Sequence, residues 1–309
     1  MKRLGIGIRP LWLVGAACGV FIDRLVGEPP TSAHPLVYFG RAMGTVEGMI
    51  YRDSRRRGIL HALIGTSLGG AAGRFIRSTA LSSYVAVGGR ALGEAANSVG
   101  DALAREDLDR ARELLPALVG RDPRALDETE ISRAVVESVA ENTVDAVVAP
   151  MMWAALCGPV GALAYRSINT LDAMVGHHSE RYEKYGWASA RLDDVVNFVP
   201  ARVSALLVAL VRPRATFDVV RGVATQAPGH PSPNSGVGEV AFAAALGLRL
   251  GGRNIYDGRV EDRVHLGYGR AAKGADIKEA TRLARDVATL LAVLLIVAGV
   301  VFREPRRIS

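Results

Sequence analysis

The 309-residue chain has two cysteines and few aromatic residues, and each scarcity excludes a class of structure. Cys18 and Cys157 lie in apolar runs and match no CxxC pattern, so we expect two small core residues rather than a disulfide framework or a zinc centre. Aromatic residues make up 6% of the chain and hydrophobic residues 49%, a balance typical of packed helices rather than sheets. The mean hydropathy of +0.18 excludes a largely disordered chain.

The standard nucleotide-binding motifs are absent, and lysine is scarce. The sequence contains no GxxxxGK[ST] loop, no GxGxxG segment and no HExxH motif. Four of the 38 basic residues are lysines, so arginine carries the net charge of +7, and arginine suits forked contacts to carboxylates and phosphates. No basic helix or aromatic RNA-binding pattern is present, so we expect no nucleic acid; a membrane surface or an anionic substrate fits the charge better.

Long apolar runs are abundant, and about 20 helical residues cross a bilayer. We therefore predict an all-α, polytopic integral membrane protein with about five or six membrane segments, some of them short or broken. A soluble helical protein with a very apolar core is the less favoured alternative. The run 146–165 is interrupted by Pro150, Gly158 and Pro159, so we expect it to form a broken span or two half-helices. The candidate runs are 10–22, 58–73, 78–93, 146–165, 195–211 and 287–302.

Polar helices are expected between these runs. Residues 100–118 have the spacing of an amphipathic helix, and a new helix begins near Asp127, where Glu130 completes a capping box. We predict one helical membrane domain over 1–309, with a polar helical insertion at about 94–135 and a polar loop region at about 212–286. Basic residues flank both ends of the first run (Lys2, Arg3 and Arg9; Arg52 and Arg55–Arg57), whereas Arg303, Arg306 and Arg307 favour a cytoplasmic C-terminus.

Three carboxylates share one face of the helix predicted over 130–150. Glu137, Glu141 and Asp145 fall within about 80° of helix circumference. Like charges four residues apart repel, so a divalent cation would stabilise them. We predict that the three bind Mg²⁺ together with phosphates, with Asn142 in support. A solvated acidic face fits the spacing equally well.

A second group of polar residues lies on an apolar helix further along the chain. Arg166, Asn169 and Asp172 share about 120° of helix circumference. Polar groups on an intramembrane helix are costly and indicate a functional site. The alternative is an internal ion pair between arginine and aspartate that holds two spans together. His177 and His178 are adjacent in sequence, which makes a poor metal-binding pair on a helix.

Further candidates lie at the starts of two other helices. Asp193, Asp194 and Asn197 open the run 195–211, where Asp194 would equally serve as an N-terminal cap. The stretch 230–236 contains two prolines and a glycine, so a loop is expected there, followed by a helix from about Val237 that Asn234 or Ser235 caps. A helix N-terminus suits a phosphate, and an ordinary capped loop is the alternative. The phosphate candidates of this loop are His230, Ser232 and Asn234.

Several strings together resemble the CobD/CbiB family of cobalamin biosynthesis, the adenosylcobinamide-phosphate synthases. They run in the family's order over nearly the whole chain. The stretch 59–91 departs from the family, which has a fuller pair of apolar helices there. The strings are GEPP…HP…FGR (27–41), YRD (51–53), ESVAENTVDAVVAP (137–150), YRSINTLDAMVGH (165–177), YGWASARLDDVVNFVPAR (185–202) and HPSPNSGVGE (230–239).

The resemblance implies an enzyme that joins a carboxylate of adenosylcobyric acid to (R)-1-amino-2-propanol, or to its O-phosphate, through an amide bond. ATP drives the step, Mg²⁺ assists it, and the site faces the cytoplasm from the cell membrane. The resemblance marks these segments as important, and residue type and spacing within them assign substrate or phosphate binding to eight residues: His34, Arg41, Asn142, Asn169, Asn197, His230, Ser232 and Asn234. Arg166 would pair with a phosphate or with the corrinoid carboxylate. Asp172, Asp193 or Asp194 would receive the proton of the amine.

Two other classes of protein compete with this interpretation. A transporter would use the intramembrane carboxylates as an ion path, although no inverted repeat is visible. A membrane sensor would keep the family's fold without its chemistry. The sequence does not specify the oligomeric state, and both a homo-oligomer and a complex with other enzymes of the cobalamin pathway are compatible with this function.

Overall fold

The computed structural model describes residues 9–30, 32–120, 122–177, 179–256 and 259–302. The predicted roles of Lys2, Arg3, His178, Arg303, Arg306 and Arg307 lie outside these residues. The chain divides into two compact units, each built from separate stretches of sequence. The first consists of Met1–Gly88, Ala149–Val196 and Leu291–Ser309, and the second of Gly89–Val148 and Asn197–Leu290. The predicted single domain stays a prediction.

Helices form nearly all of the described structure, which confirms the predicted all-α membrane protein. The helices that begin in the first unit are α1 (Pro10–Val26), α2 (Pro35–Ile50), α3 (Arg55–Ile76), α4 (Thr79–Ala86), α8 (Ala149–Leu171) and α9 (Trp187–Val211). The second unit contains α5 (Gly89–Ala104), α6 (Leu108–Leu114), α7 (Glu128–Thr143), α10 (Thr216–Thr225), α11 (Ser235–Leu246) and the start of α12 (Gly274–Val301). Short helical turns are η1 (Leu115–Ala117), η2 (Val144–Val148), η3 (Asp172–Gly176), η4 (Pro213–Ala215) and η5 (Ala227–Gly229).

Among the described residues, four helices are long and apolar enough to cross a membrane, fewer than the five or six expected. They are α3, the continuous helix Glu128–Gly176, α9 and α12. The first apolar run forms α1, which has 17 residues and falls short of that length. The run 78–93 is not one helix, because α4 ends at Ala86 and α5 begins at Gly89.

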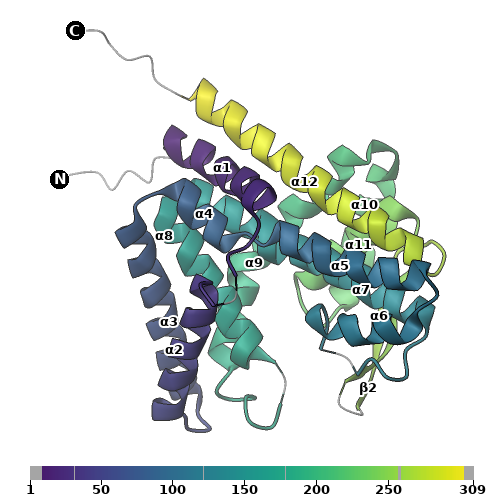
Figure 1. Ribbon diagram of the computed structural model, residues 1–309, viewed down its shortest axis with the longest axis horizontal. Coiled ribbons are helices and arrows are strands. Elements are labelled where there is room, and N and C mark those ends of the chain that lie inside the picture. The colour runs from purple at the N-terminus through teal and green to yellow at the C-terminus, as the bar shows by residue number, and fades with distance from the viewer. Residues whose placement is uncertain (1–8, 31, 121, 178, 257–258, 303–309) are drawn as a thin grey trace. The chain divides into compact units, whose positions relative to one another are not determined.

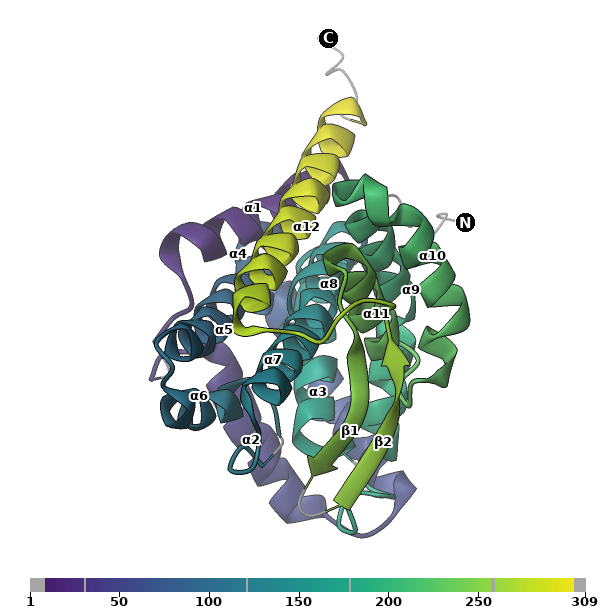
Figure 2. The same ribbon diagram turned by 90° about the vertical axis from the view of Figure 1, so that its right-hand side faces the viewer.

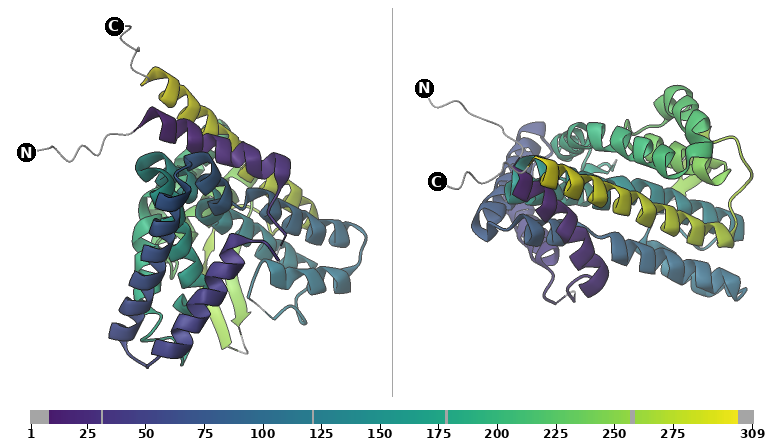
Figure 3. Two further views of the ribbon diagram at one scale, coloured as in Figure 1. Left: turned by 60° about the vertical axis from the view of Figure 1, so that its left-hand side comes forward. Right: turned by 90° about the horizontal axis from the view of Figure 1, so that it is seen from above.

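The packing of the first unit depends on small residues, which let two helices approach closely. On α3, Gly69 and Gly73 lie so close to α8 that a Cβ at either position would collide with Ser167 or with the Pro159 carbonyl. Helix α1 packs against α4 and α8, and α2 runs alongside α3 (Figures 1 and 3). The predicted break is present in α8, where Gly158 has the non-helical angles φ 64° and ψ −149°.

The second unit holds the strands of the structure. Strands β1 (Leu250–Tyr256) and β2 (Arg259–Leu266) pair antiparallel and lie beside α11 (Figure 2). The region 212–286 therefore contains α10, α11, a hairpin and the first turns of α12, and the prediction of a polar loop region there was wrong. The amphipathic helix predicted over 100–118 is divided, because Glu106 has a positive φ of 59° between α5 and α6. The capping box of Asp127 and Glu130 is confirmed at the start of α7.

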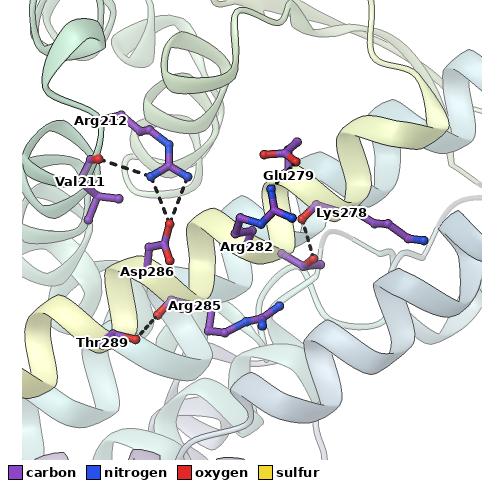
Figure 4. Close-up of polar contacts among 9 residues, drawn as sticks. Val211, Arg212, Lys278, Glu279, Arg282, Arg285, Asp286 and Thr289 are labelled. Atoms are coloured by element: carbon purple, nitrogen blue, oxygen red, sulfur yellow. Dashed lines mark hydrogen bonds and ion pairs between the residues drawn. The ribbon is translucent and has the colours of Figure 1, made fainter.

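The first half of α12 is polar, although the second half is the most apolar segment of the chain. Asp286 accepts two hydrogen bonds of 3.1 Å from the guanidinium of Arg212, at the end of α9 (Figure 4). One turn earlier, Arg282 pairs with Glu279 at 2.7 Å. The apolar run 287–302 thus begins directly after the ion pair between Arg212 and Asp286, at the point where the sequence of α12 changes from polar to apolar.

Candidate functional site

A chain of polar side chains connects α8 to α9 in the first unit. Nη1 of Arg166 donates to Oδ1 of Asn169 at 3.1 Å, and Nδ2 of Asn169 donates to Oδ1 of Asp193 at 3.4 Å. We call these three residues the Arg166 group. The sequence predicted each of them as a site residue, and the structure brings them together.

The guanidinium of Arg166 is incompletely satisfied. Its Nε is buried and has no hydrogen-bond partner within the described part of the chain. An unsatisfied buried donor costs about 1–3 kcal/mol, and more when it carries charge. A carboxylate or phosphate would accept from Nε in the forked geometry that guanidinium groups favour. Arg166 is therefore the residue at which the structure most directly suggests an anion.

Asp172 and Asp194 lie on the same helices but in other environments. Asp172 opens the π-helical turn η3, and its carboxylate covers Gly176 so closely that a Cβ there would collide with it. Such wide turns occur frequently at functional sites. Asp194 pairs with Arg191 at 3.4 Å. Because α9 begins at Trp187, Asp194 lies inside the helix, and the alternative of an N-terminal cap was wrong.

In the second unit, the predicted metal ligands have separate partners. Oε1 of Glu137 accepts a 2.8 Å hydrogen bond from the backbone N–H of Gly251 in β1, and Glu137 is 4% exposed. Arg133, one turn earlier on α7, donates to the Gly251 carbonyl. Glu137 is thus an anchor for the hairpin. Asp145 lies in the π-helical turn η2, after the end of α7.

Glu141 faces the loop before α11. Its Oε1 accepts a 2.8 Å hydrogen bond from the Ser235 hydroxyl. Ser232 Oγ accepts from the backbone N–H groups of Asn234 and Ser235, each at 3.2 Å. Asn142, predicted to support a metal, instead donates to the Ser138 carbonyl at 2.9 Å. Among the described residues, no group of three or more His, Cys, Asp or Glu side chains is placed to hold a metal ion.

His230 is the most enclosed residue of this loop. Its Nδ1 lies 3.1 Å from the backbone nitrogen and 3.2 Å from the carbonyl oxygen of Ser232, and its Nε2 lies 3.5 Å from Oε1 of Glu239. Both side chains are nearly buried, at 3% and 4% exposure. Burial is the main cause that lowers the pKa of His230, and the charge of Arg263 lowers it further, whereas the backbone hydrogen bond with Ser232 and the charges of Glu141 and Glu137 oppose this shift. The imidazole is therefore neutral near pH 7.

The remaining predicted residues also have defined contacts. Asn234 stands at the N-cap position of α11, which begins at Ser235, and its Oδ1 accepts from Nη1 of Arg202 at 2.9 Å. Its side chain makes no capping hydrogen bond. Asn197 is 1% exposed on α9.

Two predicted phosphate ligands belong to the start of α2. His34 caps that helix, because its Nδ1 accepts from the Leu36 N–H at 3.2 Å, and its Nε2 lies 3.5 Å from Glu28. Arg41 lies over the Tyr38 ring at 5.9 Å. These contacts hold both side chains on the local structure, and phosphate binding by either stays a prediction.

Glu47, a carboxylate on α2, was not predicted as a site residue from the sequence. Glu47 is 8% exposed and accepts hydrogen bonds of 2.9 Å from both Arg181 Nη2 and the Tyr182 hydroxyl. Burial, with a smaller contribution from Glu47, raises the pKa of Tyr185 to about 12. The sequence offered one indication of this contact, because Glu47 is the one charged residue within 42–51. Glu239 was likewise not predicted as a site residue.

Comparisons with known proteins agree with the strings found in the sequence. A sequence model of the family described as "CobD/Cbib protein" matches residues 16–284. The "Cobalamin biosynthesis protein CobD" of Mycobacterium tuberculosis is 43% identical over 92% of this chain and 95% of its own. The proteins of that name from Pelobacter propionicus and Halalkalibacterium halodurans are 38% and 37% identical, over 91% and 94% of this chain and 95% and 98% of their own. No solved structure matches.

Proposed function

Because the chain belongs to the CobD/CbiB family of cobalamin biosynthesis, we propose that it is an enzyme that forms the amide bond of adenosylcobinamide or its phosphate. The acyl donor is a carboxylate of adenosylcobyric acid, and the amine is (R)-1-amino-2-propanol or its O-phosphate. ATP is the proposed energy source. The family match over most of the chain carries the proposal, and the unsatisfied Nε of Arg166 supports an anionic substrate.

The residues of the first unit provide the groups that this reaction needs. A carboxylate is a poor acyl donor, so its activation, as an acyl phosphate in our proposal, requires a cation against the reacting oxygens. Arg166 supplies that cation, and Asn169 holds its guanidinium at 3.1 Å. Asp193, bonded to the same amide, is the proposed acceptor of the amine proton. The amine must be neutral to attack, which makes such a base necessary.

Phosphate binding is proposed for the loop before α11. The N–H groups at the start of a helix of 12 residues attract an anion, and Ser232 and Ser235 present hydroxyl groups there. Glu141 already lies on Ser235, so a phosphate at this position needs a counter-ion. The three predicted carboxylates do not fit a resident metal site, because Glu137 is bonded to the hairpin backbone. Mg²⁺ therefore enters our proposal with ATP.

The proposed reaction also implies a location for the protein in the cell. We propose a multi-pass protein of the cell membrane whose reaction takes place on the cytoplasmic side, where ATP is available. Four helices of suitable length and composition support membrane insertion. A homo-oligomer and an assembly with other enzymes of the pathway are both compatible with this proposal.

The test is amide formation by the purified full chain in detergent, followed by mass spectrometry. Adenosylcobyric acid, Mg-ATP and each of the two amines are supplied in parallel. We expect a product with one amine, at the mass of cobinamide or its phosphate. Arg166→Gln should abolish the product and Arg166→Lys should weaken it, because lysine keeps the charge without the fork. Arg110→Gln, on the exposed surface of α6, is the matched control.

Failure has a clear meaning in this design. If folded protein yields no product with either amine, the proposed enzyme function is wrong, and a transporter or a sensor becomes the favoured class. If product forms but Arg166→Gln has wild-type activity, the function stands and the proposed site is wrong.

A further inference from the structure

The turn between α3 and α4 is rigid and exposed. Arg77 ends α3 in the left-handed conformation, with φ 61° and its N–H on the Gly73 carbonyl. Ser78 then caps α4 by accepting the Leu81 N–H at 3.3 Å. Gly73 packs directly against Pro159 of α8, which fixes the end of α3 from the inside. The side chains of Arg74, Phe75 and Arg77 are all exposed.

These three residues surround an open cavity. It has a volume of about 520 Å³ and is lined by Ala71, Arg74, Phe75 and Arg77. Neither guanidinium group forms a hydrogen bond, ion pair or ring contact with another described residue. Phe75 is 88% exposed, more than any other large apolar residue of α3. Two unpaired guanidinium groups beside an exposed aromatic ring present both charge and apolar surface to one ligand.

The position along α3 limits what that ligand can be. Helix α3 has 22 residues, or about 33 Å, close to the roughly 30 Å of a bilayer's hydrocarbon core. In its most apolar window, 28% of the residues are buried inside the protein, so most of this helix is available to lipid. If α3 spans the bilayer, Arg74 and Arg77 lie at its end, at the depth of the phosphate groups of the lipids.

We propose that this cavity binds the headgroup of an anionic phospholipid. Arg74 and Arg77 donate to the phosphate oxygens, in the forked geometry that arginine makes with phosphate. Phe75 lies against the upper part of the acyl chains. This inference does not rest on amide synthesis, because none of these residues belongs to the proposed reaction.

Native mass spectrometry of the purified full chain tests the proposal. The protein in detergent is titrated with phosphatidylglycerol, with phosphatidylcholine of the same acyl chains, and with inorganic phosphate. The variants are Arg74→Gln/Arg77→Gln and Arg74→Lys/Arg77→Lys. The matched control is Arg105→Gln/Arg110→Gln, which removes the same charge from exposed arginines outside the candidate membrane spans.

We expect the wild type to retain one phosphatidylglycerol and little phosphatidylcholine. Near a lipid surface each arginine is worth about fivefold in affinity, so the double glutamine variant should bind phosphatidylglycerol more than tenfold less tightly. The lysine variant should bind with intermediate affinity, and the control should match the wild type. Equal retention of both lipids by the wild type overturns the proposal without reference to any variant. Equal loss in the control, or displacement of the lipid by inorganic phosphate, overturns it as well.

Discussion

Replacing Glu137 distinguishes a structural carboxylate from a metal ligand. Its side chain is 4% exposed and bonds to the buried N–H of Gly251 at 2.8 Å. A hydrogen bond to a charged group contributes about 1.5–3 kcal/mol, and Glu137→Ala also leaves the Gly251 N–H without an acceptor. We therefore expect Glu137→Ala to lower the stability by about 2–4 kcal/mol and Glu137→Gln by about 1 kcal/mol, because glutamine keeps an acceptor oxygen.

The assay is thermal unfolding of the detergent-purified protein at one heating rate. For a protein of this size, each kcal/mol changes Tm by about 2–4 °C, so alanine should lower it by several degrees and glutamine by few. Glu113→Ala, which removes an exposed carboxylate of α6, should leave Tm unchanged. Hydrogen exchange at Gly251 should accelerate in Glu137→Ala alone.

One result would refute this reasoning. If Glu137→Ala unfolded at the wild-type temperature and protected the Gly251 amide normally, yet lost amide formation, then Glu137 would be a ligand-binding group. The hairpin would then need another anchor, and the predicted metal site on α7 would return to favour.

Three further predictions concern the pH dependence, the break in α8 and the Arg166 group. The pKa of His230 is lowered in the folded protein, so the unfolded chain binds more protons below pH 6.5 and stability should fall as the pH decreases from 7 towards 5. His230→Gln should remove that part of the slope, as Tm measured across this range would show; an unchanged slope would contradict the assignment. Gly158→Ala should lower the free energy of unfolding by about 1–3 kcal/mol, which a lower Tm would show, because φ is 64° and the Trp12 ring occupies the space of a Cβ; Gly93→Ala, where the Cβ meets open space, is the control. Asp193→Asn should lower kcat at least tenfold with little change in Tm, as kinetics and unfolding measured on the same preparation would show; a wild-type kcat would remove Asp193 from the reaction.

The helical fold was predictable because its signals are local. The apolar runs gave α3, α9 and α12, and the Asp127–Glu130 spacing gave the start of α7 to the residue. Errors arose where a run of suitable composition contains a turn. In the run 78–93, Gly88 and Gly89 follow the end of α4 at Ala86, so a local turn signal was present although the overall composition suited one helix.

The candidate site was predictable only in part, for the same reason. Helical spacing placed Arg166 and Asn169 together, since they are three positions apart on one helix. It also placed Glu137 with Glu141, but a shared helix face does not give two side chains the same partner. Glu137 bonds to β1 and Glu141 to the loop before α11, and those partners are 114 and 94 residues away in sequence. Contacts at such separation leave no periodic trace in the sequence.

The interleaved connectivity has a consequence for how the protein is made. The chain passes between the two compact units after residues 88, 148, 196 and 290, so neither unit is a contiguous stretch. The first unit lacks its last packing partner until α12 is synthesised, because Gly299 of that helix packs against Val14 and the Pro10 carbonyl of α1. During translation, α4 and α8 cover part of α1 early, but the surface around Val14 and Pro10 waits for α12. Truncation at the C-terminus should therefore expose surface at the N-terminal end of the chain to proteases and chaperones.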